Sequence, residues 1–122
     1  MTPSLRVCAL YPELMNIYAD RGNIALLRAR CEWRGLGFEH AAASLGDGFV
    51  ADAHDLFYMG GGQDRDQVTV AHDMAATKRE ALHAAADRGA VVLAVCGGYQ
   101  LLGQSYELGG EELPGVGLVD LR

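Results

Sequence analysis

A cysteine between an apolar run and two glycines is the residue of this sequence best suited to nucleophilic chemistry. The apolar stretch 93–95 leads into Cys96, and the segment GGYQ follows at 97–100. Small residues allow a sharp turn from a strand into a helix, on which a side chain stands clear while backbone N–H groups converge beside it. The unpaired amides of a helix N-terminus also favour a thiolate. We therefore predict that Cys96 is a nucleophile rather than a buried core cysteine.

A second glycine turn, Gly60-Gly61-Gly62, follows the apolar run 56–59. Attack of a thiolate on an amide carbonyl creates an oxyanion, which two backbone N–H groups are enough to hold. We predict that these N–H groups come from Gly97 and from Gly61 or Gly62; an ordinary tight turn is the alternative at 60–62. Neither GxGxxG nor GxxxxGK[ST] is present, so a nucleotide site lacks its usual residues.

Apolar runs alternate with helical patterns along the chain, and this alternation sets where the two glycine turns lie. Strands are predicted over residues 5–10, 38–43, 56–59 and 91–95, and helices over residues 23–34 and 66–88. The alternation predicts an α/β fold with a doubly wound parallel sheet and right-handed crossovers. Both glycine turns then follow the carboxyl ends of strands, where open α/β sheets bind ligands.

Local features add further expectations. The uncharged, β-branched run 91–95 is typical of a central strand buried on both faces, and 66–88 is expected to be one long helix. Residues 105–117 show no clear period, and 118–121 are a candidate for the start of another strand. A loop is expected over 16–22, with Asn23 capping the next helix. The polar residues of this loop and of the helix cap are expected either to form local hydrogen bonds or to contact a ligand. They are Asn16, Tyr18, Asp20, Arg21 and Asn23.

Composition excludes several functional classes. Half of the 122 residues are hydrophobic, which is enough for one compact domain or a piece of a larger one. A formal net charge of -6 argues against a nucleic-acid partner. Three irregularly spaced cysteines predict neither a disulfide framework nor a metal site, and Cys8 and Cys31 are expected to be packing residues. Without a bilayer-length apolar run or a signal peptide, we expect a cytoplasmic protein with no direct membrane insertion.

Three segments resemble a known enzyme family. AVCGGYQ at 94–100 is similar to the nucleophile turn of class I glutamine amidotransferases, most of all their cobyric acid synthase-like branch. Ala94 stands where many members carry glycine, which is also small. YPELMNIYADRGN at 11–23 and GGGQD at 60–64 are more specific. Together they resemble the glutaminase subunits of lipid II isoglutaminyl synthases, and the similarity runs from Leu5 to Leu121.

This resemblance implies a flavodoxin-like class I amidotransferase sandwich that hydrolyses glutamine through a cysteine thioester. It implies Cys96 as the nucleophile, Gly97 with Gly61 or Gly62 as the oxyanion hole, and Gln100 near the bound glutamine. The implied partner is a Mur ligase-like synthetase subunit in a heterodimer. With ATP and Mg, that subunit uses the ammonia to amidate D-glutamate of lipid II in peptidoglycan synthesis. The resemblance implies no cofactor in this chain.

The resemblance also implies a histidine base well downstream of the nucleophile turn at 94–100, whereas this sequence ends at Arg122. Its own histidines are not predicted at the carboxyl end of any strand: His40, His54, His72 and His83. We therefore expect residues 1–122 to be the amino-terminal portion of a single amidotransferase domain, truncated on its C-terminal side. Alone, it is expected to be inactive and to expose an edge or face of the strand 91–95.

Two alternative functions stay open from the residues. One is a cobyrinic or cobyric acid-type amidotransferase domain, which a fused ATP-binding domain would favour. The other is a catalytically silent binding module in which the cysteine is a redox sensor or a relic, for which the missing histidine is the support.

Overall fold

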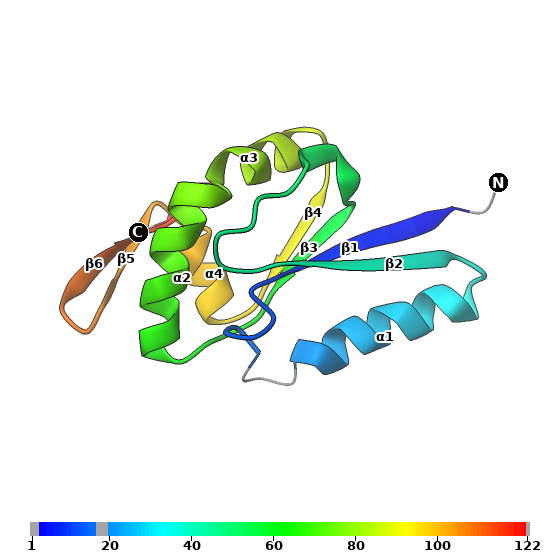
Figure 1. The fold of residues 1–122 in the computed structure, drawn as a ribbon, viewed down its shortest axis with the longest axis horizontal. Coiled ribbons are helices and arrows are strands. Elements are labelled where there is room, and N and C mark those ends of the chain that lie inside the picture. Colours follow the sequence, from blue (N-terminus) through cyan, green and yellow to red (C-terminus); the bar gives the residue numbers. More distant parts are fainter. Residues whose placement is uncertain (1–2, 17–19, 122) are drawn as a thin grey trace.

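A four-stranded parallel sheet organises the chain (Figure 1). The structure is a computed structural model and describes residues 3–16 and 20–121. The sheet order is β2-β1-β3-β4. The strands are β1 (Ser4–Leu10), β2 (Gly37–Ala43), β3 (Leu56–Met59) and β4 (Val91–Ala94). Helix α1 (Asp20–Trp33) joins β1 to β2, and α2 (Asp64–Thr77) and α3 (Arg79–Asp87) join β3 to β4. The predicted doubly wound α/β sheet is confirmed, because the chain leaves the central pair β1 and β3 in opposite directions.

Alternation along the strands assigns one face of the sheet to the main core. Cys8 and Leu10 of β1 and Phe57 and Met59 of β3 pack with apolar side chains of α2 and α3. These helical side chains recur on one stripe: Val70, Ala71, Met74, Leu82 and Ala85. Successive strand residues point to opposite faces, so the neighbours Ala9 and Tyr58 belong to the face that α1 approaches. There a hollow of about 320 Å³ separates α1 from the sheet.

Strand β4 corrects one sequence expectation, because it lies at the edge of the sheet rather than at its centre. Val92 and Ala94 pack against the main core. Val91 and Leu93 point to the other face and are 55% and 42% exposed. The run was predicted to be buried on both faces because its composition is uniformly apolar. The exposed face that was expected for this strand in residues 1–122 is observed.

The long helix predicted over 66–88 is two helices that meet at Lys78. Lys78 has φ -126° and ψ -13°, which ends α2 and precedes α3. The Thr77 hydroxyl donates to the carbonyl of Asp73 at 2.9 Å, a contact that bends helices. Both helices keep their apolar stripe toward the sheet, so the apolar periodicity did not reveal the break.

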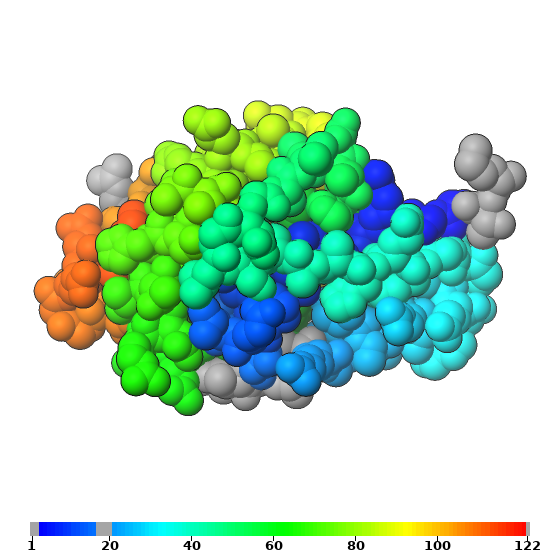
Figure 2. Space-filling view, in the orientation of Figure 1, coloured from blue at the N-terminus to red at the C-terminus, as the bar shows by residue number. Residues whose placement is uncertain are grey.

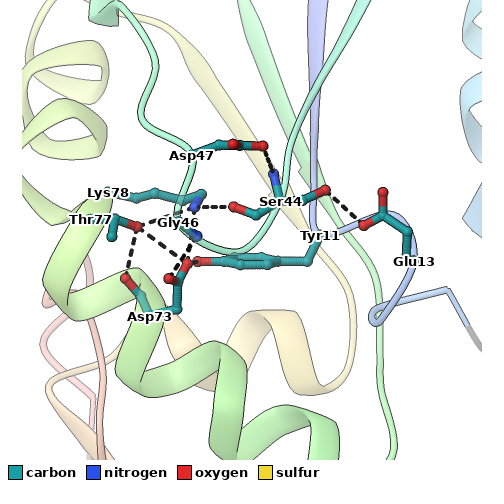
Figure 3. Close-up of polar contacts among 8 residues, drawn as sticks. All are labelled: Tyr11, Glu13, Ser44, Gly46, Asp47, Asp73, Thr77 and Lys78. Carbon is teal, nitrogen blue, oxygen red and sulfur yellow. Dashed lines mark hydrogen bonds and ion pairs between the residues drawn. The ribbon is translucent and has the colours of Figure 1, made fainter.

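The side chain of Lys78 is fully buried at this junction. Figure 3 shows its contacts with Ser44 and Asp73. Its Nζ donates to the carbonyl of Ser44 at 2.7 Å and to Asp73 Oδ2 at 3.1 Å, and lies 4.5 Å from the centre of the Tyr11 ring. The Tyr11 hydroxyl donates to the same Asp73 oxygen at 2.7 Å. Burial acts to raise the pKa of Asp73, but the hydrogen bonds from Tyr11, the Gly46 N–H and Lys78 outweigh it and hold that pKa below its usual range. This cluster joins the connections after β1 and β2 to the α2–α3 junction.

Other boundaries differ from the sequence expectations for local reasons. Helix α1 begins at Asp20, so Asn23 lies inside it and does not cap it. The stretch 105–117, which shows no period, contains an antiparallel hairpin of β5 (Ser105–Leu108) and β6 (Glu111–Pro114). Gly109 and Gly110 turn that hairpin with φ values of 61° and 82°, a conformation glycine adopts at little cost. Residues 118–121 form no strand.

The connection from β2 to β3, residues 44–55, crosses the front of the molecule over the sheet (Figure 2). It includes the short 3-10 turn η1 (Ala51–Ala53), and Phe49 packs against the core. The Arg88 guanidinium donates to the carbonyls of Ala51 and His54, which fixes the connection to α3. Within residues 3–16 and 20–121, no helix is long and apolar enough to cross a membrane.

Candidate active site

Cys96 lies on a strained turn between β4 and the short helix α4 (Gly97–Leu101). Its φ of 55° is rare for a residue that is not glycine, and such backbone strain concentrates at functional sites. The side chain is exposed. The carbonyl of Cys96 accepts the N–H of Tyr99 at 3.0 Å, which begins the helix directly after the cysteine. The predicted strand-to-helix turn is therefore present, and it presents the thiol to solvent.

The two glycine turns predicted to form one site pack against each other at Gly98. A Cβ on Gly98 would lie 2.7 Å from the carbonyl oxygen of Met59 and 2.8 Å from that of Gly60. Both atoms belong to the backbone, so glycine is required for this close approach. The N–H of Val95 also donates to the Met59 carbonyl at 3.0 Å. The turn after β3 and the turn after β4 thus sit side by side at the carboxyl ends of adjacent strands.

Residues of the connection after β1 pack closely against Gly62. A Cβ there would lie 2.6 Å from Met15 Sδ and 2.9 Å from the carbonyl oxygen of Leu14. Met15 is buried, and its N–H donates to the carbonyl of Tyr11 at 2.8 Å. Gly61 is also buried. The buried cluster around Lys78 therefore supports this turn through Tyr11.

Gly97 is buried, and its N–H is the first of α4, so it has no acceptor inside the helix. The side chain packed against it comes from Gln67 of α2, a residue that sequence reasoning did not single out. A Cβ on Gly97 would lie 1.5 Å from Gln67 Nε2. A glutamine on a helix carries no motif of its own, so only the packing of α2 beside the elbow reveals it.

An open hollow of about 450 Å³ lies next to Cys96. Gln100, predicted near a bound substrate, lines it together with Cys96. Both side chains are exposed. The hollow is completed by residues of α4, the hairpin and the segment after it: Tyr99, Ser105, Tyr106 and Leu121. The arrangement leaves room for a small substrate against the thiol.

The other two thiols are packing residues, as predicted. Cys8 and Cys31 are 1% and 6% exposed. Burial raises the pKa of Cys8 to about 11, so its reactive thiolate is scarce near neutral pH. Among the described residues, no group of three or more potential ligand side chains is arranged to hold a metal ion.

The four histidines make their contacts with residues other than Cys96. His83 Nε2 is 2.5 Å from the carbonyl oxygen of Val116, and His72 Nε2 is 3.9 Å from Glu111 Oε1. The His54 ring meets the Phe57 ring edge-to-face, with centroids 5.6 Å apart, and burial lowers the pKa of His54. His40 lines the hollow beside α1. No hydrogen bond of the described residues joins a histidine to Cys96.

Two polar residues around the start of α1 make hydrogen bonds within the chain, which is one of the two readings left open. Asn23 Nδ2 donates to the Tyr58 hydroxyl at 2.7 Å, and Asn16 Nδ2 donates to the Pro12 carbonyl at 2.6 Å. Both contacts are internal hydrogen bonds. Arg21 lines the hollow beside α1. Tyr18 lies outside the described residues.

A cysteine on a strained strand-to-helix turn, beside a glycine turn of the neighbouring parallel strand, has the backbone geometry of a nucleophile elbow in an α/β fold. The match to known proteins is more specific. Residues 6–122 match the CobB/CobQ-like glutamine amidotransferase domain, and the chain belongs to that family.

Three comparisons carry this assignment further. The chain is 40% identical over 116 residues to the GatD subunit of lipid II isoglutaminyl synthase (glutamine-hydrolyzing) from Streptococcus pneumoniae, which covers 94% of this chain and 44% of that protein. GatD of Staphylococcus aureus is 36% identical over 109 residues, 88% of this chain and 44% of that protein. A probable cobyric acid synthase of Methanopyrus kandleri is 56% identical over 43 residues, 30% of this chain and 9% of that protein.

The fold comparison agrees with the sequence comparisons. The structure of PurLQS from Thermotoga maritima superposes with a TM-score of 0.53 at 25% identity, over 84% of this chain and 43% of that chain. The chain spans less than half the length of the curated GatD relatives that it matches.

Proposed function

We propose that residues 1–122 are the nucleophile-bearing, amino-terminal portion of a glutaminase domain that supplies ammonia for lipid II amidation. The observation that carries the proposal is the strained turn at Cys96, whose exposed thiol lies beside two packed glycine turns. The GatD names of relatives at 40% and 36% identity support lipid II as the acceptor.

In the proposed reaction, the Cys96 thiolate attacks the side-chain carboxamide carbon of glutamine. The new S–C bond pushes the carbonyl electrons onto oxygen, and the N–H groups of Gly97 and of Gly61 or Gly62 stabilise that oxyanion. The C–N bond then breaks, and the nitrogen leaves as ammonia with the proton that the thiol gave up. Water hydrolyses the thioester, which releases glutamate and restores the thiol.

A base must take the thiol proton and return it to the leaving nitrogen. None of the four histidines contacts Cys96 by a hydrogen bond within the described residues. The GatD relatives are more than twice as long as the matched segment. We therefore place the histidine base in a part of the domain outside residues 1–122, and we expect these residues alone to be inactive.

The proposal assigns the rest of the reaction to a partner. A Mur ligase-like synthetase subunit would use ATP and Mg to activate the D-glutamate carboxylate and would receive the ammonia in a heterodimer. This chain would need no cofactor. A cytoplasmic location goes with the proposal, because the Cys96 thiol stays reduced there.

The test uses the whole protein together with its partner subunit. Wild-type protein is expected to release ammonia from glutamine and, with ATP and lipid II, to produce amidated lipid II detectable by mass spectrometry. Cys96→Ser is expected to lose both activities, and Cys31→Ser, which changes a buried packing cysteine, is expected to keep them. Ammonia release that survives Cys96→Ser would refute the proposal.

A cobyric acid-type acceptor is the second candidate, favoured by the 43-residue segment that is 56% identical to a probable cobyric acid synthase. In the same assay, it predicts ammonia release with no amidation of lipid II and with ATP-dependent amidation of a corrinoid carboxylate. A binding module without catalysis predicts no ammonia at all.

A further inference from the structure

Two polar side chains are buried among the described residues, Gln67 and Lys78, and they differ in how they are satisfied. The ammonium of Lys78 donates to three oxygens. The carboxamide of Gln67, which is 5% exposed, makes no hydrogen bond within the described part of the chain. Buried amides normally have partners. Among the described residues only the Tyr106 hydroxyl is fully enclosed without a partner, so the Gln67 carboxamide keeps some access to solvent, from which a bound ligand can supply an acceptor.

The carboxamide of Gln67 lies directly against the nucleophile turn. Measured from a Cβ placed on Gly97, Nε2 is nearest at 1.5 Å, Cδ follows at 2.6 Å and Oε1 is farthest at 3.4 Å. The nitrogen is thus the atom directed at Gly97. Gln67 belongs to the first turns of α2, where its own N–H donates to the Gln63 carbonyl at 2.9 Å. The helix therefore fixes the position from which the side chain extends.

Two donor groups without acceptors consequently meet at the elbow. One is the N–H of Gly97, the first of α4, and the other is the NH₂ group of Gln67. Donors placed together repel each other unless one acceptor is shared between them. A negatively charged oxygen bonded to the carbon under attack by Cys96 is an acceptor of that kind.

We propose that Gln67 is a catalytic residue that donates through Nε2 to the oxyanion formed from the glutamine carboxamide, alongside the N–H of Gly97. The inference rests on the proposed function, since it needs a substrate carbonyl at Cys96. It adds a side-chain donor from α2 to the backbone donors of the two glycine turns.

The first test is Gln67→Met in the whole protein with its partner. Methionine keeps the length of the side chain but has no N–H donor. Loss of one oxyanion donor is expected to lower kcat for ammonia release about 100-fold with KM for glutamine nearly unchanged. Alkylation of Cys96 by iodoacetamide develops no oxyanion and is expected to proceed at the wild-type rate. Thr69→Val, at an exposed position of the same helix, is the control and is expected to keep wild-type kcat.

A second variant, Gln67→Glu, has the same shape and adds a dependence on pH. An ionised carboxylate repels the oxyanion, whereas the protonated acid donates to it. The ratio of variant to wild-type kcat is therefore expected to rise as pH falls toward the pKa of the introduced acid, ordinarily about 4.3. A ratio that does not change with pH overturns the donor role of Gln67. This variant decides the question if Gln67→Met does not fold.

The outcomes separate the two proposals. Wild-type kcat in Gln67→Met overturns the role of Gln67 and leaves the glutaminase proposal intact. A parallel loss of kcat and of Cys96 alkylation also overturns it, because it shows a disturbed turn rather than a lost donor. A wild-type protein that releases no ammonia overturns the proposed function, and the role of Gln67 with it.

Discussion

The Tyr11 hydroxyl donates a 2.7 Å hydrogen bond to Asp73 Oδ2 and so joins the end of the first strand to the second helix, 62 residues away. Tyr11 is fully buried, and its φ of 52° is strained for a tyrosine. Its carbonyl accepts the N–H groups of Leu14 and Met15 at 3.1 and 2.8 Å. Because Met15 packs on Gly62, the hydrogen bond between Tyr11 and Asp73 also stabilises the glycine turn at 60–62 beside Cys96.

Tyr11→Phe removes this bond and keeps the ring. A hydrogen bond to a charged group contributes about 2 kcal/mol, so the free energy of unfolding is expected to fall by about that amount in urea titrations. Tyr106→Phe is the matched control, because its hydroxyl is buried without a partner in the described structure. That variant is expected to be neutral or slightly stabilising. An equal loss in both variants would contradict this account.

Asp55→Asn tests a bidentate ion pair at the other end of the sheet. The guanidinium of Arg6 donates to both carboxylate oxygens of Asp55, at 2.8 and 3.1 Å, and holds its pKa at about 2, below the ordinary 3.8. A lowered folded-state pKa stabilises the protein above pH about 4, and this contribution is lost as pH falls toward 2.

The difference in unfolding free energy between wild type and Asp55→Asn is therefore expected to be largest near neutral pH and to shrink between pH about 4 and 2. Denaturant titrations at several pH values measure it. A difference that stays constant over this range would show that the ion pair does not lower the pKa of the Asp55 carboxyl.

Gly98→Ala and Gly97→Ala form a matched pair at the elbow. An alanine Cβ at Gly98 meets backbone oxygens of Met59 and Gly60, whereas at Gly97 it meets the movable end of Gln67. Gly98→Ala is expected to lower stability by about 1–3 kcal/mol, in the range of overpacking. Gly97→Ala is expected to cost less than about 1 kcal/mol, because alanine favours the helix once Gln67 moves aside. The reverse order in thermal unfolding would be incompatible with this packing.

The three thiols are expected to react in order of their exposure. Cys96 is exposed, Cys31 and Cys8 are buried, and burial raises the pKa of Cys8 to about 11. With brief iodoacetamide treatment of the native protein at neutral pH, peptide mapping should find the label on Cys96. After denaturation all three should be labelled. Early labelling of Cys8 in native protein would contradict the packing described here.

Much of the fold was predictable because its signals are local. The apolar run before Gly60 gave the bounds of β3, Leu56–Met59, without error. The single helix predicted over 66–88 was wrong because the break depends on Lys78, whose partners Ser44 and Tyr11 come from distant connections. The central placement of β4 was wrong because apolar composition does not say which strand becomes its neighbour. The hairpin of β5 and β6 was missed because each strand has only four residues and one buried side chain, Tyr106 or Leu113, which is too little for a period to be recognised.

The candidate site was also predictable only in part. The sequence by itself determined the turn at Cys96, since a short apolar run and two glycines specify a sharp strand-to-helix turn locally. Only the tertiary structure decided what surrounds that turn. Gln67 reaches Gly97, and Gly98 meets the carbonyls of Met59 and Gly60, because parallel pairing of β3 with β4 brings their carboxyl ends together. Such contacts depend on strand order and helix packing, which no local pattern encodes.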